Sequence, residues 1–465
     1  MSNPQRLQRA FARHGIALDY RDGVYRVRNE NALATILLPA ALPLEEKAVR
    51  QLLAFAGVRS PDGHAAVCKA CATPDFHPGA IAPVGSVVAT PHDFVIPSSI
   101  GTDINCGMRL LTTGLSLGHL APHKDALIKR LTRSLLDNGR DVPVSTRAFV
   151  ALFDDGPAAF LERLDSLGLW AQCDRERLFA EMERCIGLAA FAGHSRHVPS
   201  AYRSDAHAVF RDPGLGTPGA GNHFVELQVV DAVLDRHAAY EAGLKAGDVV
   251  AMIHSGSRDL GFYVGQAWMD RAKQAWPAGL RHPSSGLYGL QGPLADEYLQ
   301  AMGAAARYAW ANRVVLAELV RKDLEALVGA SQSRLVVDVP HNVVLREQGF
   351  NVHRKGATPA HAGDFALIPG SMGDASYLAT GLGHAEWLWS CSHGAGRAVR
   401  RQQVRALKVA PSTQQPWHCV TLREERRVEE APHAYKPIGP VIDAQEQAGL
   451  IRAAVRFRPW LTFKA

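Results

Sequence analysis

Hydrophobic and polar positions along the chain predict a protein built from both helices and strands. Apolar side chains alternate with polar ones over residues 20–38, as in β-strands, and recur at helical spacing over residues 44–56. Residues 64–113 carry short apolar runs broken by glycine, and the runs 224–230 and 249–253 predict strands that each lie beside a histidine. Strands therefore occur in several separate parts of the sequence.

Helical patterns fill much of the remaining sequence. Residues 120–200 are mainly helical in pattern, and helical spacing is clear over residues 158–190. Residues 295–329 predict the clearest helix, because they are rich in Ala and Leu and end at Gly329. Strands and glycine turns return over residues 334–400. Helices and strands thus follow one another without segregating into blocks.

No fixed-period repeat and no low-complexity linker divides the chain. We therefore expect an α+β fold with one large domain over residues 61–465, in which residues 120–200 form a helical insertion. Residues 1–60 are expected to form a smaller mixed α/β segment ahead of it.

Composition agrees with a large globular protein. Of the 465 residues, 47% are hydrophobic and 21% are charged, so an ample core is expected. The net charge of +6, with a basic stretch over residues 400–427, is compatible with a polyanionic substrate. Seven scattered cysteines do not form a disulfide framework, and no apolar run is long enough for a signal peptide or a membrane span. We therefore expect a cytoplasmic protein with no membrane contact.

Five residues have the chemistry of metal ligands. Carboxylate, thiolate and imidazole groups together suit Mn, Fe, Co or Zn better than Mg or Ca. Each also has a structural interpretation, since a single His or Cys is more often a buried packing residue than a ligand. The candidates stand in glycine-rich segments or at strand edges: Asp103, Cys106, His223, His254 and His341.

The run SHGAGR at 392–397 predicts a phosphate site. Small residues let the backbone approach a phosphate, and successive N–H groups can form an anion nest. His393 could attack a nucleotide α-phosphate, or it could be incidental to a glycine turn. Arg258 and Lys355 are candidate phosphate clamps or solvated surface charges. Asp75 is a candidate general acid or base, or a turn-stabilising residue.

Other motifs are less informative about function. Cys68 and Cys71 form a CxxC pair, but without a second pair a zinc or redox site is poorly supported. No GxxxxGK[ST] run occurs, so the common NTPase phosphate cradle is missing. No KxDG run occurs either, so the lysine-based mechanism of ordinary nucleic-acid ligases has no obvious place.

Taken together, the motifs resemble the RtcB family of RNA-splicing ligases from about residue 64 onward. The motifs that carry the resemblance are PDFHPG (74–79), DINCG (103–107), LGTPGAGNHFVE (215–226), HSGSR (254–258), HRKGAT (353–358), IPGSMG (368–373) and HGAGR (393–397). The resemblance implies β-sheets around a central metal and nucleotide cleft, with peripheral helices. It also implies two Mn²⁺ ions and GTP as cofactors.

The resemblance further implies roles for individual residues. His393 matches the histidine that becomes guanylylated, and the five metal candidates match the two-manganese ligands, with Cys106 bridging. Asp75, Arg258 and Lys355 match residues near the RNA ends. The residues that match or adjoin the nucleotide site are Asn222, Glu226, Gly370, Ser371, Gly394, Ala395, Gly396, Tyr435 and Lys464.

The resemblance therefore implies a protein that joins an RNA 3′-phosphate or 2′,3′-cyclic phosphate to a 5′-hydroxyl, in tRNA splicing or RNA repair. Some relatives need an archease-like activator, and we expect a monomer. Several positions depart from the family's usual residues, among them Cys391-Ser392, Asp259, Pro340 and Pro359. Two alternatives therefore remain: a guanylyltransferase that caps 3′-phosphate ends of RNA or DNA and seals poorly, and a non-catalytic RNA-binding homologue.

Overall fold

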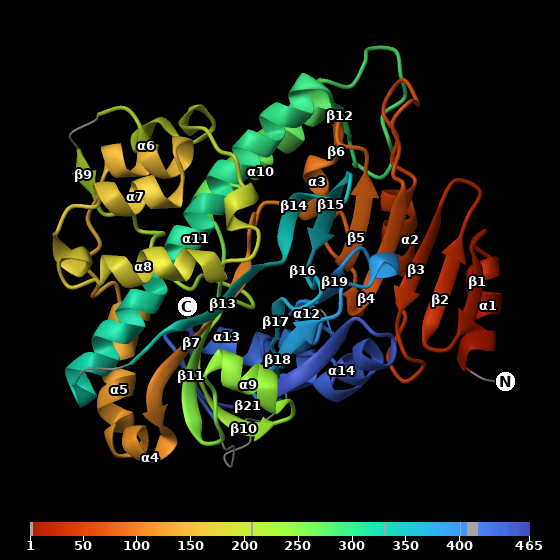
Figure 1. Ribbon diagram of the computed structural model, residues 1–465. Helices are drawn as coiled ribbons and strands as arrows, with labels where there is room; N and C mark the ends of the chain where they lie inside the picture. The colour runs from red at the N-terminus through yellow and green to blue at the C-terminus, as the bar shows by residue number, and fades with distance from the viewer. Residues whose placement is uncertain (1–2, 206–207, 330–331, 400, 407–416) are drawn as a thin grey trace.

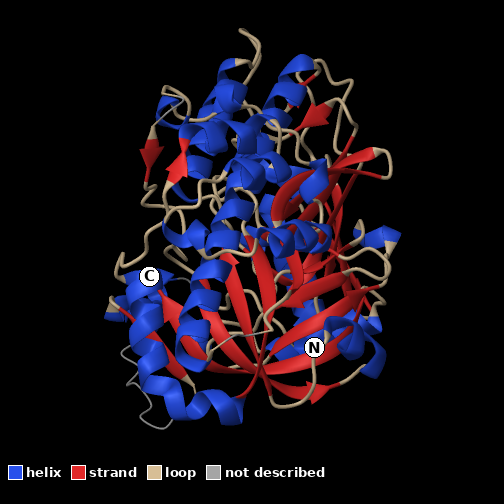
Figure 2. Ribbon diagram, turned by 60° about the vertical axis from the view of Figure 1, so that its left-hand side comes forward, coloured by secondary structure: helices blue, strands red, loops and turns tan. Residues whose placement is uncertain are grey.

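The computed structural model describes residues 3–205, 208–329, 332–399, 401–406 and 417–465. Two large β-sheets form its centre, and the helices of residues 117–181 gather on the left in Figure 1. Figure 2 shows helices on several sides of the strands. The prediction of an α+β fold with sheets at the centre and helices at the periphery is confirmed.

The first sheet has seven strands and includes the N-terminal segment. Its strands, in spatial order, are β1 (Ala17–Arg21), β2 (Val24–Arg28), β3 (Leu33–Leu37), β4 (Lys69–His77), β5 (Val84–Thr90), β15 (Phe350–Lys355) and β14 (Asn342–Glu347). Helices α1 (Asn3–Ala12) and α2 (Glu46–Ala56) accompany it. Strands within residues 20–38 and the helix within 44–56 are thereby confirmed. Because β3 pairs with β4, residues 1–60 continue the sheet, and the boundary at residue 60 stays a prediction.

The second sheet has eight strands and holds most of the candidate metal ligands at one edge. Its order is β13 (Leu335–Pro340), β7 (Gly107–Ser116), β11 (Asp248–Ser255), β10 (Phe224–Val233), β21 (Ile451–Lys464), β18 (Ser376–Gly381) and β17 (Phe365–Ile368), with β20 (His418–Thr421) parallel to β21. The predicted strands 224–230 and 249–253 lie within β10 and β11.

The long helix predicted over residues 295–329 is α11 (Pro293–Val328), which Gly329 ends. Pro293 suits the first turn, where a missing N–H costs no helical hydrogen bond. The helix is buried on nearly every side, and α10 (Arg258–Gln274) packs against it. At Gly303 a Cβ would lie 1.8 Å from the carbonyl oxygen of Ala192, so only glycine fits there. The helix is thus an internal support for the loops around it.

Residues 117–202 are helical, as predicted, but in short pieces. A continuous helix over 158–190 does not form: α7 ends before Leu164, Gly168 has a left-handed φ of 54°, and the side chain of Asp174 caps a new helix. The pieces are α4 (Leu117–Leu120), α5 (Lys124–Leu131), a π-helical turn (Thr132–Leu136), α6 (Thr146–Asp154), α7 (Pro157–Arg163) and α8 (Arg175–Glu181), with 3₁₀ turns between several of them.

The remaining elements are short and complete the loops. They are β6 (Phe94–Val95), α3 (Pro97–Ile100), β8 (Val144–Ser145), β9 (Val209–Phe210), α9 (Arg236–Ala242), β12 (Leu290–Gln291), β16 (Ala357–Pro359), β19 (Ser390–Ser392), α12 (Arg401–Ala406), α13 (Glu424–Glu429) and α14 (Ile438–Gln447). The basic stretch 400–427 lies partly outside the described residues. Within the described part of the chain, no helix is both long and apolar enough to span a bilayer.

Candidate metal and nucleotide site

Four neighbouring strands bring the candidate metal ligands to one sheet edge. Cys106 precedes β7, His223 precedes β10, His254 is near the end of β11, and His341 follows β13. The strands are antiparallel neighbours in the order β13, β7, β11, β10, so starts and ends of strands alternate along the same edge. The pairing of His254 with both Phe224 and Met108 fixes this alignment.

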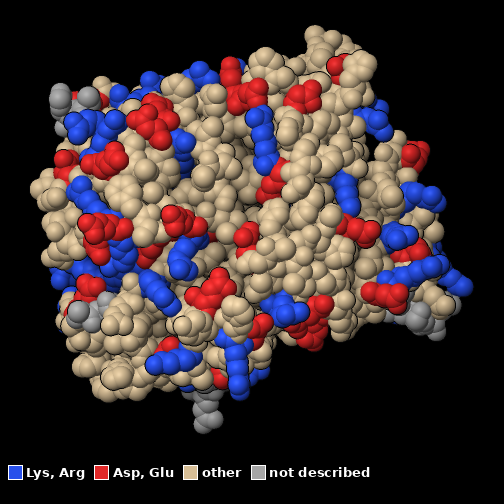
Figure 3. Space-filling model, in the orientation of Figure 1, with Lys and Arg blue, Asp and Glu red and all other residues tan. Residues whose placement is uncertain are grey.

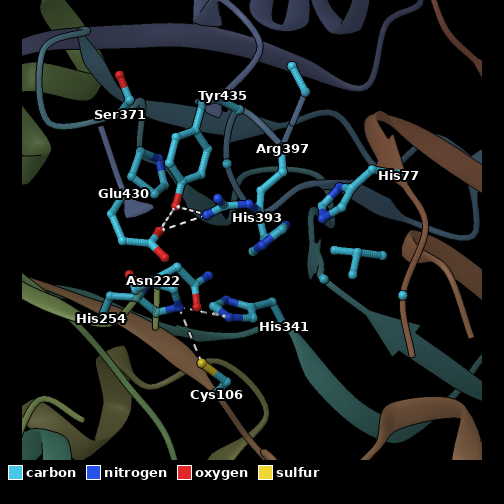
Figure 4. Close-up of a pocket in the computed structure, with 18 of the residues that line it drawn as sticks. His77, Cys106, Asn222, His254, His341, Ser371, His393, Arg397, Glu430 and Tyr435 are labelled. Carbon is cyan, nitrogen blue, oxygen red and sulfur yellow. Dashed lines mark hydrogen bonds and ion pairs between the residues drawn. The ribbon is translucent and has the colours of Figure 1, made fainter. Parts of the chain in front are cut away.

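The ligand atoms converge closely. The Sγ of Cys106 lies 3.1 Å from Nε2 of His223 and 3.2 Å from Nε2 of His254. The Nε2 atoms of His254 and His341 are 3.2 Å apart, and Oδ2 of Asp103 lies 2.9 Å from Nε2 of His223. Figure 4 shows Cys106, His254 and His341 around the floor of the cavity. All five predicted ligands therefore meet at one place.

This donor set fits a divalent transition-metal ion. Burial lowers the pKa of both His254 and His341 well below the ordinary value, which keeps the rings neutral and able to ligate. Burial, then the charge of Asp103, raises the pKa of Cys106, so the thiol keeps its proton until a cation compensates its charge. The Nδ1 atoms of His223 and His341 are buried without a hydrogen-bond partner. The atoms that converge are instead Nε2 and Sγ, and a cation between them would accept their lone pairs.

His393 lies beside this cluster and is held by Asp75. It follows β19, and its ring centre is 4.8 Å from that of His341. Its Nδ1 lies 2.6 Å from Oδ2 of Asp75, and the hydroxyl of Thr73 donates to the other carboxylate oxygen at 2.6 Å. Burial would raise the pKa of Asp75, but the hydrogen bond and charge of His393 outweigh it and lower the pKa. An ionised Asp75 thus accepts a hydrogen bond from Nδ1–H of His393, which leaves Nε2 of the ring directed away from the carboxylate.

The position of Asp75 depends on an irregularity of β4. Pairing with β5 is regular from Lys69 to Ala72 and resumes only at His77, so residues 73–76 bulge from the ladder. Asp75 is consequently fully buried and absent from the cavity wall. The candidate general acid or base Asp75 thus contacts His393 and does not reach the cavity.

A cavity of about 740 Å³ opens above the metal cluster and His393. Its wall includes every residue predicted for the nucleotide site: Asn222, Glu226, Gly370, Ser371, Gly394, Ala395, Gly396, Tyr435 and Lys464. A Cβ at Gly396 would lie 2.1 Å from the carbonyl oxygen of Asp75, so glycine is required where this loop crosses β4. The cavity thus joins the candidate metal, nucleophile and nucleotide residues.

Two buried charged groups line the far end of the cavity. Glu226 accepts hydrogen bonds from Gln228 (2.5 Å) and from the hydroxyl of Thr462, and burial raises its pKa to about 7. Lys464 donates from Nζ to the carbonyl of His223 at 3.0 Å, and burial lowers its pKa. The sequence separates these residues widely, but β21 lies beside β10 and brings them together.

The two predicted phosphate clamps differ in position. Lys355 lines the cavity and donates from Nζ to the carbonyl of Ile100 at 2.7 Å. Arg258 begins α10 outside the cavity wall, and its Nε donates to Thr217 at 3.1 Å. A side chain at Gly219 would lie 2.1 Å from Nη1 of Arg258 and 2.8 Å from Nδ1 of His223, so Arg258 borders the metal cluster.

The CxxC pair does not join the cluster. Cys68 is exposed and Cys71 is buried, and the sole metal-compatible group found among the described residues is Cys106, His223 and His254.

The comparison with known proteins decides the family. The family model described as "tRNA-splicing ligase RtcB" matches residues 58–465. The chain belongs to the RtcB family. The tRNA-splicing ligase RtcB of Archaeoglobus fulgidus is 32% identical over 83% of this chain and 85% of the relative. The RNA-splicing ligase RtcB of Mycobacterium tuberculosis is 34% identical over 83% of this chain and 95% of the relative.

In this member of the RtcB family, α11 supports the ligand loops from below. Nη1 of Arg313 donates to the carbonyls of Asn105 (2.7 Å) and Ser255 (3.2 Å), which adjoin Cys106 and His254. Asn312 adds a bond from Nδ2 to the hydroxyl of Ser255 at 2.9 Å. The spacing of the ligands is thus set by a buried helix.

Sequence reasoning missed several charged residues of the cavity wall, three of which form one cluster. Arg397, Arg401 and Glu430 line the cavity and form ion pairs with one another. Glu430 stands at the end of a highly charged run, which is typical of an exposed helix, so its burial had no local signal. Its sequence proximity to Tyr435 was the available hint.

Proposed function

We propose that the protein is an RNA ligase that uses GTP and Mn²⁺ to join 3′-phosphate or 2′,3′-cyclic phosphate ends of RNA to 5′-hydroxyl ends. The matched relatives are named RNA-splicing or tRNA-splicing ligases, which supports a ligase acting on RNA. The observation that carries the proposal is His393, held through Nδ1 by Asp75, beside a Cys–His metal cluster in one cavity.

The metal ligands proposed are Asp103, Cys106, His223, His254 and His341. Bound manganese would neutralise phosphate charge and favour in-line displacement at phosphorus. Cys106 lies between His223 and His254, as expected of a thiolate shared by two ions. Lys355 adds a positive charge on the same wall.

In this proposal Nε2 of His393 attacks the α-phosphate of GTP, forming an N–P bond as the bond to pyrophosphate breaks. Asp75 accepts a hydrogen bond from Nδ1–H and stabilises the positive charge that develops on the ring. The GMP then passes to the RNA 3′-phosphate, giving an RNA(3′)pp(5′)G end. Attack by the 5′-hydroxyl expels GMP and forms the phosphodiester bond, and a cyclic end is first hydrolysed to the 3′-phosphate.

The cavity wall supplies nucleotide contacts in this scheme. Glu226 can accept hydrogen bonds from the guanine N–H groups, with Ser371, Tyr435 and Lys464 as further base contacts. Asn222 and the small residues after His393 face the phosphates. Arg258 and Lys355 are proposed to bind the RNA ends.

A capping enzyme is the second candidate, and one observation favours it. Asp259 is exposed and directly follows Arg258, so it places a negative charge where an RNA end is proposed to bind. On the face shown in Figure 3, acidic and basic side chains are interspersed. An enzyme that binds the 5′-hydroxyl strand weakly would accumulate guanylylated 3′ ends instead of joined RNA.

Incubation with α-labelled GTP and Mn²⁺ tests the proposal. We expect an acid-labile, alkali-stable label on the wild-type protein, because a phosphoramidate P–N bond has that stability, and none on His393→Ala, which lacks the proposed nucleophile. His237→Ala, at an exposed histidine of α9, is the matched control and should label normally. Label on His393→Ala, or none on the wild type with Mn²⁺ bound, contradicts the proposal. A 3′-phosphate RNA with a 5′-hydroxyl RNA then separates ligation from capping.

A further inference from the structure

Glu430 is a buried carboxylate inside the cavity for which the steps above give no role. It follows α13 and is 1% exposed, yet it lines the cavity. Its Oε2 accepts from Nη1 of Arg397 at 3.0 Å and from the hydroxyl of Tyr435, and its Oε1 accepts from Nε of Arg401 at 2.9 Å. Figure 4 shows Glu430 between Tyr435 and Asn222, above the metal residues.

On one side of Glu430, Arg397 packs against Tyr435. Besides Glu430, Arg397 donates from Nε to the carbonyl of Val399 at 3.2 Å and from Nη2 to that of Glu429 at 2.8 Å. Its guanidinium carbon lies 5.0 Å from the centre of the Tyr435 ring. Arg397 therefore supports one face of the tyrosine while Glu430 fixes its hydroxyl, and the ring has a single orientation.

The Arg401 side faces a different part of the cavity. A Cβ at Gly221 would lie 3.1 Å from Nη2 of Arg401, so this guanidinium reaches the glycine loop that carries Asn222. Both arginines line the cavity, but the side chain of Arg401 is 43% exposed and that of Arg397 only 13%. The Nε bond of Arg401 to Glu430 leaves the outer end of the planar group directed at the loop proposed to face phosphates.

The charge of Glu430 suits this position. Burial would raise its pKa, but the positive charges of Lys464, Arg401 and Arg397 outweigh burial and hold the pKa below its usual range. The carboxylate is thus ionised at neutral pH and balances cations that would otherwise repel one another in a confined space.

We infer that Glu430 is a positioning residue that couples the base side of the nucleotide cavity to its phosphate side, by holding Tyr435 with one oxygen and Arg401 with the other. The inference rests on the proposed function, because it assumes that guanine lies at Tyr435 and the phosphates at Asn222. It assigns Arg401 as a further phosphate-binding residue and Glu430 as the group that orients it.

Binding of guanosine, GMP and GTP to the full-length protein with Mn²⁺ tests this inference. Glu430→Gln keeps the side-chain volume but removes the charge. Loss of charge-assisted hydrogen bonds should weaken GTP about 10- to 100-fold and guanosine by a smaller factor. The KM for His393 labelling should rise accordingly, while the rate at saturating GTP changes less than about threefold. Glu425→Gln, at an exposed glutamate of α13, is the control.

Two further variants test the base side and the phosphate side of the cavity separately. Tyr435→Phe should weaken guanosine and GTP by the same factor, whereas Arg401→Gln should weaken GTP and leave guanosine unchanged. Combining the two should give less than the product of the single effects, because both act through one carboxylate. If Glu430→Gln fails to fold, these two variants and their combination still test the coupling. Strictly multiplicative effects of Tyr435→Phe and Arg401→Gln on GTP affinity would overturn it.

Other results overturn the inference as well. Wild-type affinities in Glu430→Gln remove any role in nucleotide binding. Equal weakening of all three ligands with a lowered unfolding midpoint assigns Glu430 to stability alone, and tighter GTP binding means that it competes with phosphate. Glu430→Asp should recover part of the lost GTP affinity. If the wild type neither binds nor accepts label from GTP, the proposed function fails instead.

Discussion

Two buried polar clusters meet at Arg313 and differ in how their hydrogen bonds are satisfied. In the ion-pair cluster, all four carboxylate oxygens of Glu181 and Asp338 accept from the guanidinium groups of Arg109, Arg313 and Arg321. The side chains of this cluster are at most 6% exposed. Every carboxylate oxygen of the cluster is therefore matched by a guanidinium group within the protein.

The cysteine and histidines of the metal cluster are also buried, but the cluster is incomplete. Ring nitrogens of His223 and His341 have no partner, while Nε2 atoms and the Cys106 sulfur crowd together. Atoms that point their lone pairs at one another repel when no proton or cation lies between them. The comparison teaches that burial of polar groups alone does not mark a functional site, whereas the convergence of sulfur and imidazole nitrogen atoms on one point does.

The largest expected effect comes from breaking the matched cluster. Asp338→Ala leaves Arg109 and Arg313 buried without a carboxylate, which should lower the free energy of unfolding by about 3–5 kcal/mol. Denaturant unfolding measures it. Asp231→Ala, whose partner Arg456 is 44% exposed, is the control and should cost less than about 1 kcal/mol. Equal losses in the two variants would refute the distinction between the clusters.

Completing the unmatched cluster should stabilise the protein. Mn²⁺ at 100 times its dissociation constant should add about 2.7 kcal/mol to the free energy of unfolding, and a chelator should reverse this. Cys106→Ser should lose most of the gain, because a hydroxyl is a poorer ligand than a thiolate. Cys68→Ser, at an exposed cysteine, should respond as the wild type. An unfolding midpoint that does not change when Mn²⁺ is added would falsify the metal site.

The contact between His393 and Asp75 can be weakened separately. Asp75→Asn should slow His393 labelling roughly 100-fold at saturating GTP, because a neutral amide does not stabilise the charged imidazole. Since the folded pKa of Asp75 is lowered, the native carboxylate also contributes stability above its unfolded pKa, near 4, and this is lost as pH falls further. Rapid-quench labelling across pH measures the rate. Thr35→Ala, at a half-buried residue of β3, is the control. Unchanged labelling by Asp75→Asn would exclude the positioning role.

The smallest effect concerns Glu226, a buried carboxylate that accepts hydrogen bonds from the neutral side chains of Gln228 and Thr462. Its folded pKa is raised to about 7, so ionising it costs stability as pH rises from its unfolded pKa through 7. Glu226→Gln should therefore stabilise the nucleotide-free protein by about 1–3 kcal/mol at pH 8 and by little at pH 4. Thermal unfolding at the two pH values checks this. A gain that is the same at both would show that charge is not the cause.

Sequence reasoning found the ligands because each stands beside a strand or within a glycine motif, and the family resemblance supplied their roles. It could not place Asp75 against His393, since the two lie 318 positions apart and meet through a bulge in β4. The run 158–190 kept helical spacing although Gly168 and the Asp174 cap interrupt it. Glu430 was missed because burial within a charged run arises from tertiary packing alone.

The place of β21 has a consequence for how the chain assembles. This strand follows every other strand of its sheet in sequence, yet it lies between β10 and β18. During synthesis β10 and β18 emerge first and must keep facing edges unpaired until residues 451–464 arrive. A nascent or truncated chain lacking this strand exposes two edges open to intermolecular pairing. It also lacks Lys464 and so cannot close the nucleotide cavity.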